Sequence, residues 1–257
     1  MYTGVNKIQL LINMKPKRFV PNKHDIFMSL ATLYLGLVWL YIMSLEVQVP
    51  RKYRQRNKMQ NFGGQLQYLT VIALSMTCIS LIAKRMQKLF KFYMLTLVVE
   101  TIVTAYYWTL YVASPSSLFP FGIQPLSLAI ELSLHVMPIV LLWYDLIVNT
   151  PAQDVNKVEA ARSIFIFASL YMAWMELCKS RNSFYPYPLV HNMKVLHKSV
   201  LVIVTVAFGV VIETVAMRIT YLVKRLVKKS AFDSYTSGDH DNLIPYFLLE
   251  KIVIKHE

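Results

Sequence analysis

The sequence predicts an all-α protein, a polytopic transmembrane helix bundle of six spans with both termini in the cytoplasm. Of the 257 residues, 56% are hydrophobic, and the mean hydropathy is +0.43, whereas soluble domains carry fewer apolar residues and more charge. The apolar residues also lie in blocks of roughly 20, the length that crosses ~30 Å of hydrocarbon. Because lipid offers no partner to unpaired backbone groups, such blocks must be helices.

Six apolar blocks mark the predicted spans. The fifth is the weakest, because it is short and contains Glu176 near its end, so five spans is the alternative. Basic residues precede the first block and no small-residue cleavage site follows it, which predicts an uncleaved targeting signal. We divide the chain into a basic tail at 1–24, a membrane domain at 25–225 and a C-terminal tail at 226–257. The predicted spans are 26–45, 66–83, 92–113, 125–148, 164–178 and 200–223.

The net charge of +13 is interpreted as a signal of topology rather than of nucleic-acid binding. With the N-terminus in the cytoplasm, the cytoplasmic side carries the larger share of Lys and Arg, as the positive-inside rule requires. The basic loop at 51–58 is the exception, and we expect it to lie on anionic headgroups. The tail is expected to be flexible over 230–242 and to carry a short amphipathic segment at 244–254. We expect an endoplasmic reticulum or other endomembrane protein rather than one of the plasma membrane.

The sequence indicates no cofactor and no metal. Cys78 and Cys178 fall in different spans and are expected to be too far apart for a disulfide. No CxxC pair or His/Cys cluster has the spacing of a metal site. Haem binding is not expected, because His135 is the only histidine within the predicted spans. The aromatic residues around the turn at 114–122 are typical of an interfacial belt. They are Tyr106, Tyr107, Trp108, Tyr111, Phe119 and Phe121.

Five ionisable residues fall well inside the predicted spans. A charged group at mid-bilayer costs about 2.5–3.5 kcal/mol even on lenient insertion scales, so several of them favour an internal polar cavity. Glu131 and His135 are four residues apart and share a helix face, where a carboxylate orients an imidazole and raises its basicity. Pro138 lies one turn beyond and is expected to kink the helix beside His135. The five residues are Glu100, Glu131, His135, Asp145 and Glu213.

Thr70 is the candidate partner of His135. A threonine in a membrane helix usually bonds to backbone or to a neighbouring helix, and a buried histidine can do the same, so a purely structural role is an open alternative. The spans that carry Thr70 and His135 are predicted to run in the same direction, which places both residues in the outer half of the bundle. There a histidine base could activate the threonine hydroxyl.

Three stretches of the sequence resemble the androgen-induced protein family, which includes the androgen-dependent TFPI-regulating protein. The first is Phe62-Gly63-Gly64 through Tyr68-Leu69-Thr70 and the second is Glu131 to His135 followed by Pro138. The third is Tyr171-Met-Ala-Trp174 with Asn182 and Tyr187-Pro188. The resemblance implies a six-helix membrane hydrolase of fatty acid esters of hydroxy fatty acids, with Thr70 as the nucleophile and His135 as the base.

This chain departs from the family pattern at three positions. Glu131 stands where the family more often has Asn or Asp, and the proline follows the histidine sooner. Ser183 replaces the glycine that follows the asparagine.

Two classes of function follow from these residues. In the first, a lipid substrate enters from the bilayer, Glu131 orients His135, and His135 deprotonates Thr70. The oxyanion hole that this reaction needs is not identified, although Tyr187 and Asn182 are candidates because their loop should lie on the same side. In the second, the protein is a non-catalytic lipid-binding or assembly factor and the polar residues join helices. A proton-coupled transporter is disfavoured, because no inverted repeat is visible.

Overall fold

The computed structural model describes residues 23–46, 62–83, 89–119, 125–149, 156–191 and 193–237, and this part of the chain is helical with no strand. The predicted basic tail (except Lys23 and His24), the loop at 51–58 and the amphipathic segment at 244–254 lie outside the described residues. The elements in chain order are α2 (Lys23–Ser44), the 3-10 helix η1 (Gly64–Gln67), α3 (Leu69–Ala83), α4 (Phe90–Ala113), α5 (Pro115–Leu118), α6 (Leu128–His135), α7 (Met137–Asn149), α8 (Lys157–Asn182), α9 (Pro188–His191) and α10 (Val195–Ser237).

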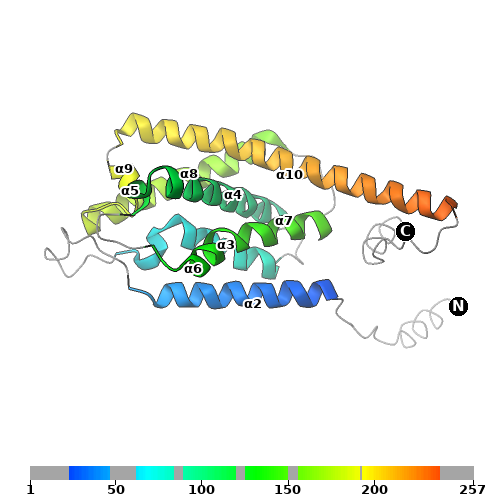
Figure 1. Ribbon diagram of the computed structural model, residues 1–257. Helices are drawn as coiled ribbons and strands as arrows, with labels where there is room; N and C mark the ends of the chain where they lie inside the picture. The colour runs from blue at the N-terminus through cyan, green and yellow to red at the C-terminus, as the bar shows by residue number, and fades with distance from the viewer. Residues whose placement is uncertain are drawn as a thin grey trace, which may run out of the picture.

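The long helices form one elongated bundle (Figure 1). Helix α10 packs on α8, α4 and α7, and α3 packs between α4 and α2. Helix α2 begins and α10 ends at the same end of the bundle, and the short α5 and α9 lie together at the opposite end (Figure 1). The chain is therefore an integral multi-pass membrane protein by helix length and composition, and the cytoplasmic assignment of the α2–α10 end stays a prediction.

Five of the helical segments are long and apolar enough to cross a membrane, among the residues that the structure describes. They are α2, α4, the α6–α7 pair, α8 and α10. The remaining predicted span, at 66–83, forms α3, which has 15 residues and covers about 22 Å at 1.5 Å per residue. The structure therefore supports five spans, and six stays a prediction that depends on α3; the short segment is the second rather than the fifth.

Helix α8 shows why the doubt about the fifth span was misplaced. It has 26 residues and runs past Glu176 to Asn182. The Glu176 carboxylate accepts hydrogen bonds from Lys198 Nζ on α10 (2.5 Å) and from the Tyr185 hydroxyl (2.8 Å). A charge near the end of a span costs little when it is paired and can reach the interface, so Glu176 does not end the helix.

Helix α10 is longer than its apolar block. It has 43 residues, about 65 Å, and it continues through the residues that we assigned to a separate tail from 226. A hydrocarbon layer of ~30 Å covers only half of that length. Hydropathy marks where a helix leaves the lipid, whereas a helix ends only where capping or breaking residues stop it. The sequence from 224 to 237 contains neither Gly nor Pro, and the first such residue is Gly238.

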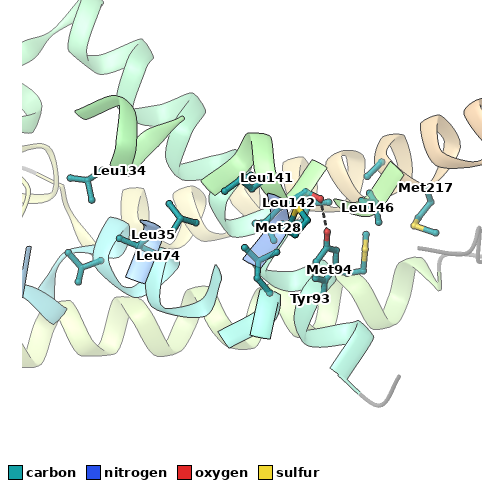
Figure 2. Close-up of a cluster of buried hydrophobic side chains, with 14 of the residues drawn as sticks. Met28, Leu35, Leu74, Tyr93, Met94, Leu134, Leu141, Leu142, Leu146 and Met217 are labelled. Carbon is teal, nitrogen blue, oxygen red and sulfur yellow. Dashed lines mark hydrogen bonds between the residues drawn. The ribbon is translucent and has the colours of Figure 1, made fainter. Parts of the chain in front are cut away.

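The largest buried apolar cluster joins α2, α3, α4, α6, α7 and α10 (Figure 2). Leu35, Leu74, Leu97 and Leu142 are fully buried in it. The Tyr93 hydroxyl donates to the Leu142 carbonyl at 2.6 Å, which gives this buried phenol a partner inside the cluster (Figure 2). The cluster holds α3, whose second residue is the candidate nucleophile Thr70, against the neighbouring helices.

At Gly209, α10 lies close to both α4 and α8. A Cβ at this position would lie 2.9 Å from a Val98 methyl and 2.8 Å from an Ile164 methyl. Gly209→Ala is therefore expected to destabilise the protein by about 1–3 kcal/mol, because both neighbours are buried. Gly36→Ala in α2 is the matched control, since a Cβ there meets nothing within 4 Å and alanine favours the helix. Thermal midpoints in detergent should fall for the first variant and hold or rise for the second; equal midpoints would contradict the packing argument.

Candidate active site

The chain enters α3 through a tight turn that is fixed by α8. Gly63 has φ +84°, and a Cβ on it would lie 3.0 Å from Cys178 Sγ and 3.1 Å from the Trp174 ring. Any other residue is thus excluded by both backbone conformation and space. The Asn182 side chain accepts a hydrogen bond from the Phe62 N–H (2.9 Å) and donates one to the Phe62 carbonyl (3.0 Å). These contacts explain the Phe-Gly-Gly sequence as a docking element for the end of α8.

Three further side chains hold the segment between this turn and Thr70. Trp174 Nε1 donates to the Leu66 carbonyl (2.9 Å), and the Tyr171 hydroxyl donates to the Gln67 carbonyl (3.0 Å). The Leu69 N–H donates to the Tyr187 hydroxyl oxygen at 2.9 Å. Two of the three stretches that carry the family resemblance therefore fold against each other, and Thr70 lies where they meet.

Thr70 is half-buried in the first turn of α3, and Tyr187 is its polar neighbour. The Tyr187 hydroxyl interacts with the Thr70 side chain and its backbone N–H in addition to the Leu69 N–H. The Tyr187 ring meets the Tyr68 ring edge-on, with centroids 6.0 Å apart. Burial raises the pKa of Tyr187, so its hydroxyl remains protonated at neutral pH. The nucleophile candidate thus faces a neutral phenol.

His135 ends α6, and the predicted kink is confirmed. Val136 separates α6 from α7, which begins at Met137, immediately before Pro138. The Thr104 hydroxyl on α4 donates to the His135 carbonyl at 2.6 Å and so satisfies a backbone group that the break exposes. The break places the histidine at a helix end, and its side chain is held by α4 and by its own helix.

The His135 ring is 4% exposed and lies in a polar enclosure. Its Nε2 atom is 3.6 Å from Glu131 Oε2, and the other Glu131 oxygen accepts from the Leu126 N–H at 2.9 Å. The Tyr107 ring stacks on the imidazole with centroids 3.5 Å apart and an interplanar angle of 11°. His135 Nδ1 is buried and makes no hydrogen bond. With Glu131 facing Nε2, the unpaired Nδ1 is the nitrogen that could accept a proton.

Thr70 and His135 lie on helices that contact each other. Helix α3 packs on α6, and Val71, Leu74 and Leu134 belong to one buried apolar cluster. No hydrogen bond joins the Thr70 hydroxyl to the His135 ring, although both residues lie in the described part of the chain. The structure therefore brings the two helices together and gives each residue its own polar neighbours, Tyr187 for Thr70 and Glu131 for His135.

Two other buried acids have hydrogen-bond partners of their own. Glu100 on α4 is fully buried and accepts from the Thr77 hydroxyl at 2.7 Å. Asp145 on α7 accepts from Asn149 at 2.6 Å, and Asn149 lies 2.5 Å from His24 Nε2. His24 is 7% exposed at the start of α2, and His197 lies near the start of α10. The candidate spans therefore contain two histidines besides His135, and the expectation that His135 is the only one was wrong.

Sequence reasoning missed two residues that surround the histidine. Tyr107 was assigned to an interfacial aromatic belt, yet it is buried and stacks on His135, and Thr104 was not singled out. Both lie on one face of α4 with Glu100, at helical spacings of four and seven residues. That polar stripe within an apolar helix is the signal that could have identified them. The two cysteines are both free, as predicted.

Ser183 occupies a backbone position that favours glycine. It ends α8 with φ 67° and is the only non-glycine residue with positive φ in the described part of the chain. Left-handed backbone costs an L-residue roughly 1–2 kcal/mol, so Ser183→Gly is expected to raise the stability by about 0.5–1 kcal/mol after the entropy of the unfolded chain is included. Ser180→Gly, one turn earlier in the helical part of α8, is expected to lower it. Thermal midpoints of the two variants test this, and a fall for Ser183→Gly would show that the serine side chain matters here.

Comparison with known proteins gives one family and one relative. The family described as FAR-17a/AIG1-like protein matches residues 27–221. A UPF0641 membrane protein of Schizosaccharomyces pombe is 28% identical over 152 residues, which cover 55% of this chain and 68% of the relative. No solved structure matches. The matched range runs from α2 to α10 and includes both Thr70 and His135.

Proposed function

Because the chain belongs to the FAR-17a/AIG1-like family, we propose that it is a membrane-embedded lipid ester hydrolase with Thr70 as the nucleophile and His135 as the general base. The observation that carries the proposal is the environment of the buried His135 ring. Its Nε2 atom faces the Glu131 carboxylate, and its Nδ1 atom makes no hydrogen bond. The helix that carries His135 packs against the helix that carries Thr70. An imidazole oriented by a carboxylate is the arrangement that activates hydroxyl nucleophiles.

The proposed reaction is acyl transfer in two steps. Thr70 Oγ1 attacks the ester carbonyl while His135 Nδ1 takes the hydroxyl proton. The tetrahedral intermediate then expels the alkoxide, which receives that proton from His135 and leaves as the alcohol. Water attacks the acyl-threonine, again giving a proton to Nδ1, and the proton returns to Thr70 as the fatty acid is released. A bridging water or a small shift of α6 against α3 closes the distance between the two residues.

Glu131 has a holding role in this scheme. Its Oε2 faces His135 Nε2, which fixes the Nε2–H tautomer and stabilises the imidazolium that forms. Its Oε1 accepts from the Leu126 N–H, so the carboxylate itself is anchored. The Glu131 side chain is longer than the Asn or Asp that the family more often has here, and it brings its Oε2 atom to 3.6 Å from His135 Nε2.

The proposed substrates are fatty acid esters of hydroxy fatty acids, and the proposed location is the endoplasmic reticulum or another endomembrane. Apolar side chains cover the outside of the bundle, so an acyl chain can approach from the bilayer. A non-catalytic lipid-binding or assembly protein is the second candidate, and the absence of a hydrogen bond between Thr70 and His135 favours it. In that case the polar residues would only join helices.

A fluorophosphonate probe distinguishes the two candidates. Membranes that contain the full-length protein are labelled and digested, and the modified peptide is identified by mass spectrometry. The hydrolase predicts one adduct, on the peptide that contains Thr70, because only an activated hydroxyl attacks the probe. An unlabelled protein, or an adduct confined to another residue, would contradict the proposal.

A further inference from the structure

The Tyr187 hydroxyl contacts the start of α3 at the candidate nucleophile. A phenol has one proton to donate and lone pairs to accept with. The Leu69 N–H takes one lone pair at 2.9 Å. The same hydroxyl lies beside the Thr70 side chain and the Tyr171 hydroxyl. Tyr187 therefore brings a phenol into contact with the candidate nucleophile.

The neighbouring donors are already committed. The Asn182 amide nitrogen donates to the Phe62 carbonyl while its oxygen accepts the Phe62 N–H, so the second candidate from the sequence is engaged at both ends. Trp174 donates to the Leu66 carbonyl and Tyr171 to the Gln67 carbonyl. Among the side chains that contact this turn, Tyr187 is the one whose hydroxyl also contacts Thr70.

The loop that carries Tyr187 is fixed independently of the site. Tyr185, two residues earlier, is buried and its hydroxyl contacts Glu176 and Lys198. The Tyr187 ring packs edge-on against Tyr68, the residue that precedes α3. The phenol is therefore held in place before any substrate binds, as electrostatic stabilisation of a transition state requires.

We infer that Tyr187 is a catalytic hydrogen-bond donor of this site, which orients Thr70 in the resting protein and donates to the ester oxygen as that oxygen becomes negative. The carbonyl oxygen of a tetrahedral intermediate lies one carbon from Thr70 Oγ1, so the same O–H reaches it after a small rotation. Tyr187 keeps its proton throughout, and the Thr70 proton still passes to His135. The inference rests on the proposed function and assigns the oxyanion donor that the sequence left open.

The test is Tyr187→Phe in the full-length protein, measured by hydrolysis of a fatty acid p-nitrophenyl ester. Removing one oxyanion donor lowers kcat by about 10²–10³-fold. KM is expected to stay within about threefold, because the ring and its packing remain. Tyr93→Phe is the matched control: it also deletes a buried tyrosine hydroxyl, but one that donates to the Leu142 carbonyl in the apolar cluster rather than facing the reacting atoms. Its kcat is expected to stay within about threefold of the wild type.

The outcomes separate the two proposals. Equal losses of kcat in Tyr187→Phe and Tyr93→Phe, with a shared fall in thermal midpoint, would mean that the loss comes from reduced stability alone, and this would overturn the inference. A normal kcat in Tyr187→Phe, while labelling still depends on Thr70, overturns the inference alone. Hydrolysis and labelling that do not depend on Thr70 overturn the proposed function and the inference with it.

Discussion

Thr70→Ala is expected to reduce ester hydrolysis by roughly 10⁴–10⁶-fold, the loss seen when a hydroxyl nucleophile is deleted from an enzyme of this type. The alanine leaves the helix intact, because Thr70 lies in the first turn of α3 and its helix is held by buried leucines rather than by its hydroxyl. Hydrolysis by purified protein in detergent gives the measurement, and the thermal midpoint is expected to change little.

Two companion variants sharpen this test. Thr70→Ser keeps a hydroxyl at the same position and is expected to retain activity within about tenfold. Thr32→Ala removes a half-buried threonine whose hydroxyl donates only to the Met28 carbonyl of its own helix, and it is expected to be fully active. If Thr70→Ala hydrolyses the ester as fast as Thr32→Ala, Thr70 is not the nucleophile.

His135→Ala is expected to lower kcat by about 10²–10⁴-fold, the usual contribution of a general base. The variant also loses the stacking contact with Tyr107, so a fall in stability of about 1–2 kcal/mol accompanies it. Glu131→Gln is expected to cause a smaller loss of kcat, because the amide oxygen can still accept from the Leu126 N–H while the charge facing Nε2 is gone.

His24→Ala is the matched control for the histidine. His24 is also buried and hydrogen-bonded, to Asn149 and Tyr144, but it lies at the start of α2, at the other end of α7 from the break beside His135. It is expected to lose stability and keep kcat. A pattern in which both histidine variants lose stability to the same degree and neither loses activity would assign His135 to a structural role.

The helix break beside His135 could be predicted from the sequence, but the residue that donates to the exposed His135 carbonyl could not. Pro138 lacks an N–H and crowds the preceding turn, which is a local effect and follows from the residue alone. The carbonyl that is satisfied there accepts from Thr104, a residue of another helix 31 positions earlier. Which threonine reaches this carbonyl depends on how α4 and α6 pack, and hydropathy contains no information on that.

The lengths of the spans also depend partly on local sequence and partly on contacts between helices. The apolar blocks located the long helices but not the short α5 and α9, and α3 is shorter and α8 longer than their blocks suggested. Glu176 made the fifth block look weak, and its pairing with Lys198 explains why α8 continues. Hydropathy treats each charge as unpaired, whereas in the folded protein a charge costs little once a partner on a neighbouring helix neutralises it.

The sequence by itself determined that this is a helical multi-pass membrane protein, where its helices run, and which residues deserve chemical attention. Those properties depend on local composition, on residues four apart on one helix, and on single residues such as Pro138. The tertiary structure decided what each polar group faces. It placed Tyr187 beside Thr70, Tyr107 on His135 and Asn182 on Phe62, contacts between helices far apart in sequence. Such contacts arise from the packing of whole helices, which no single segment encodes.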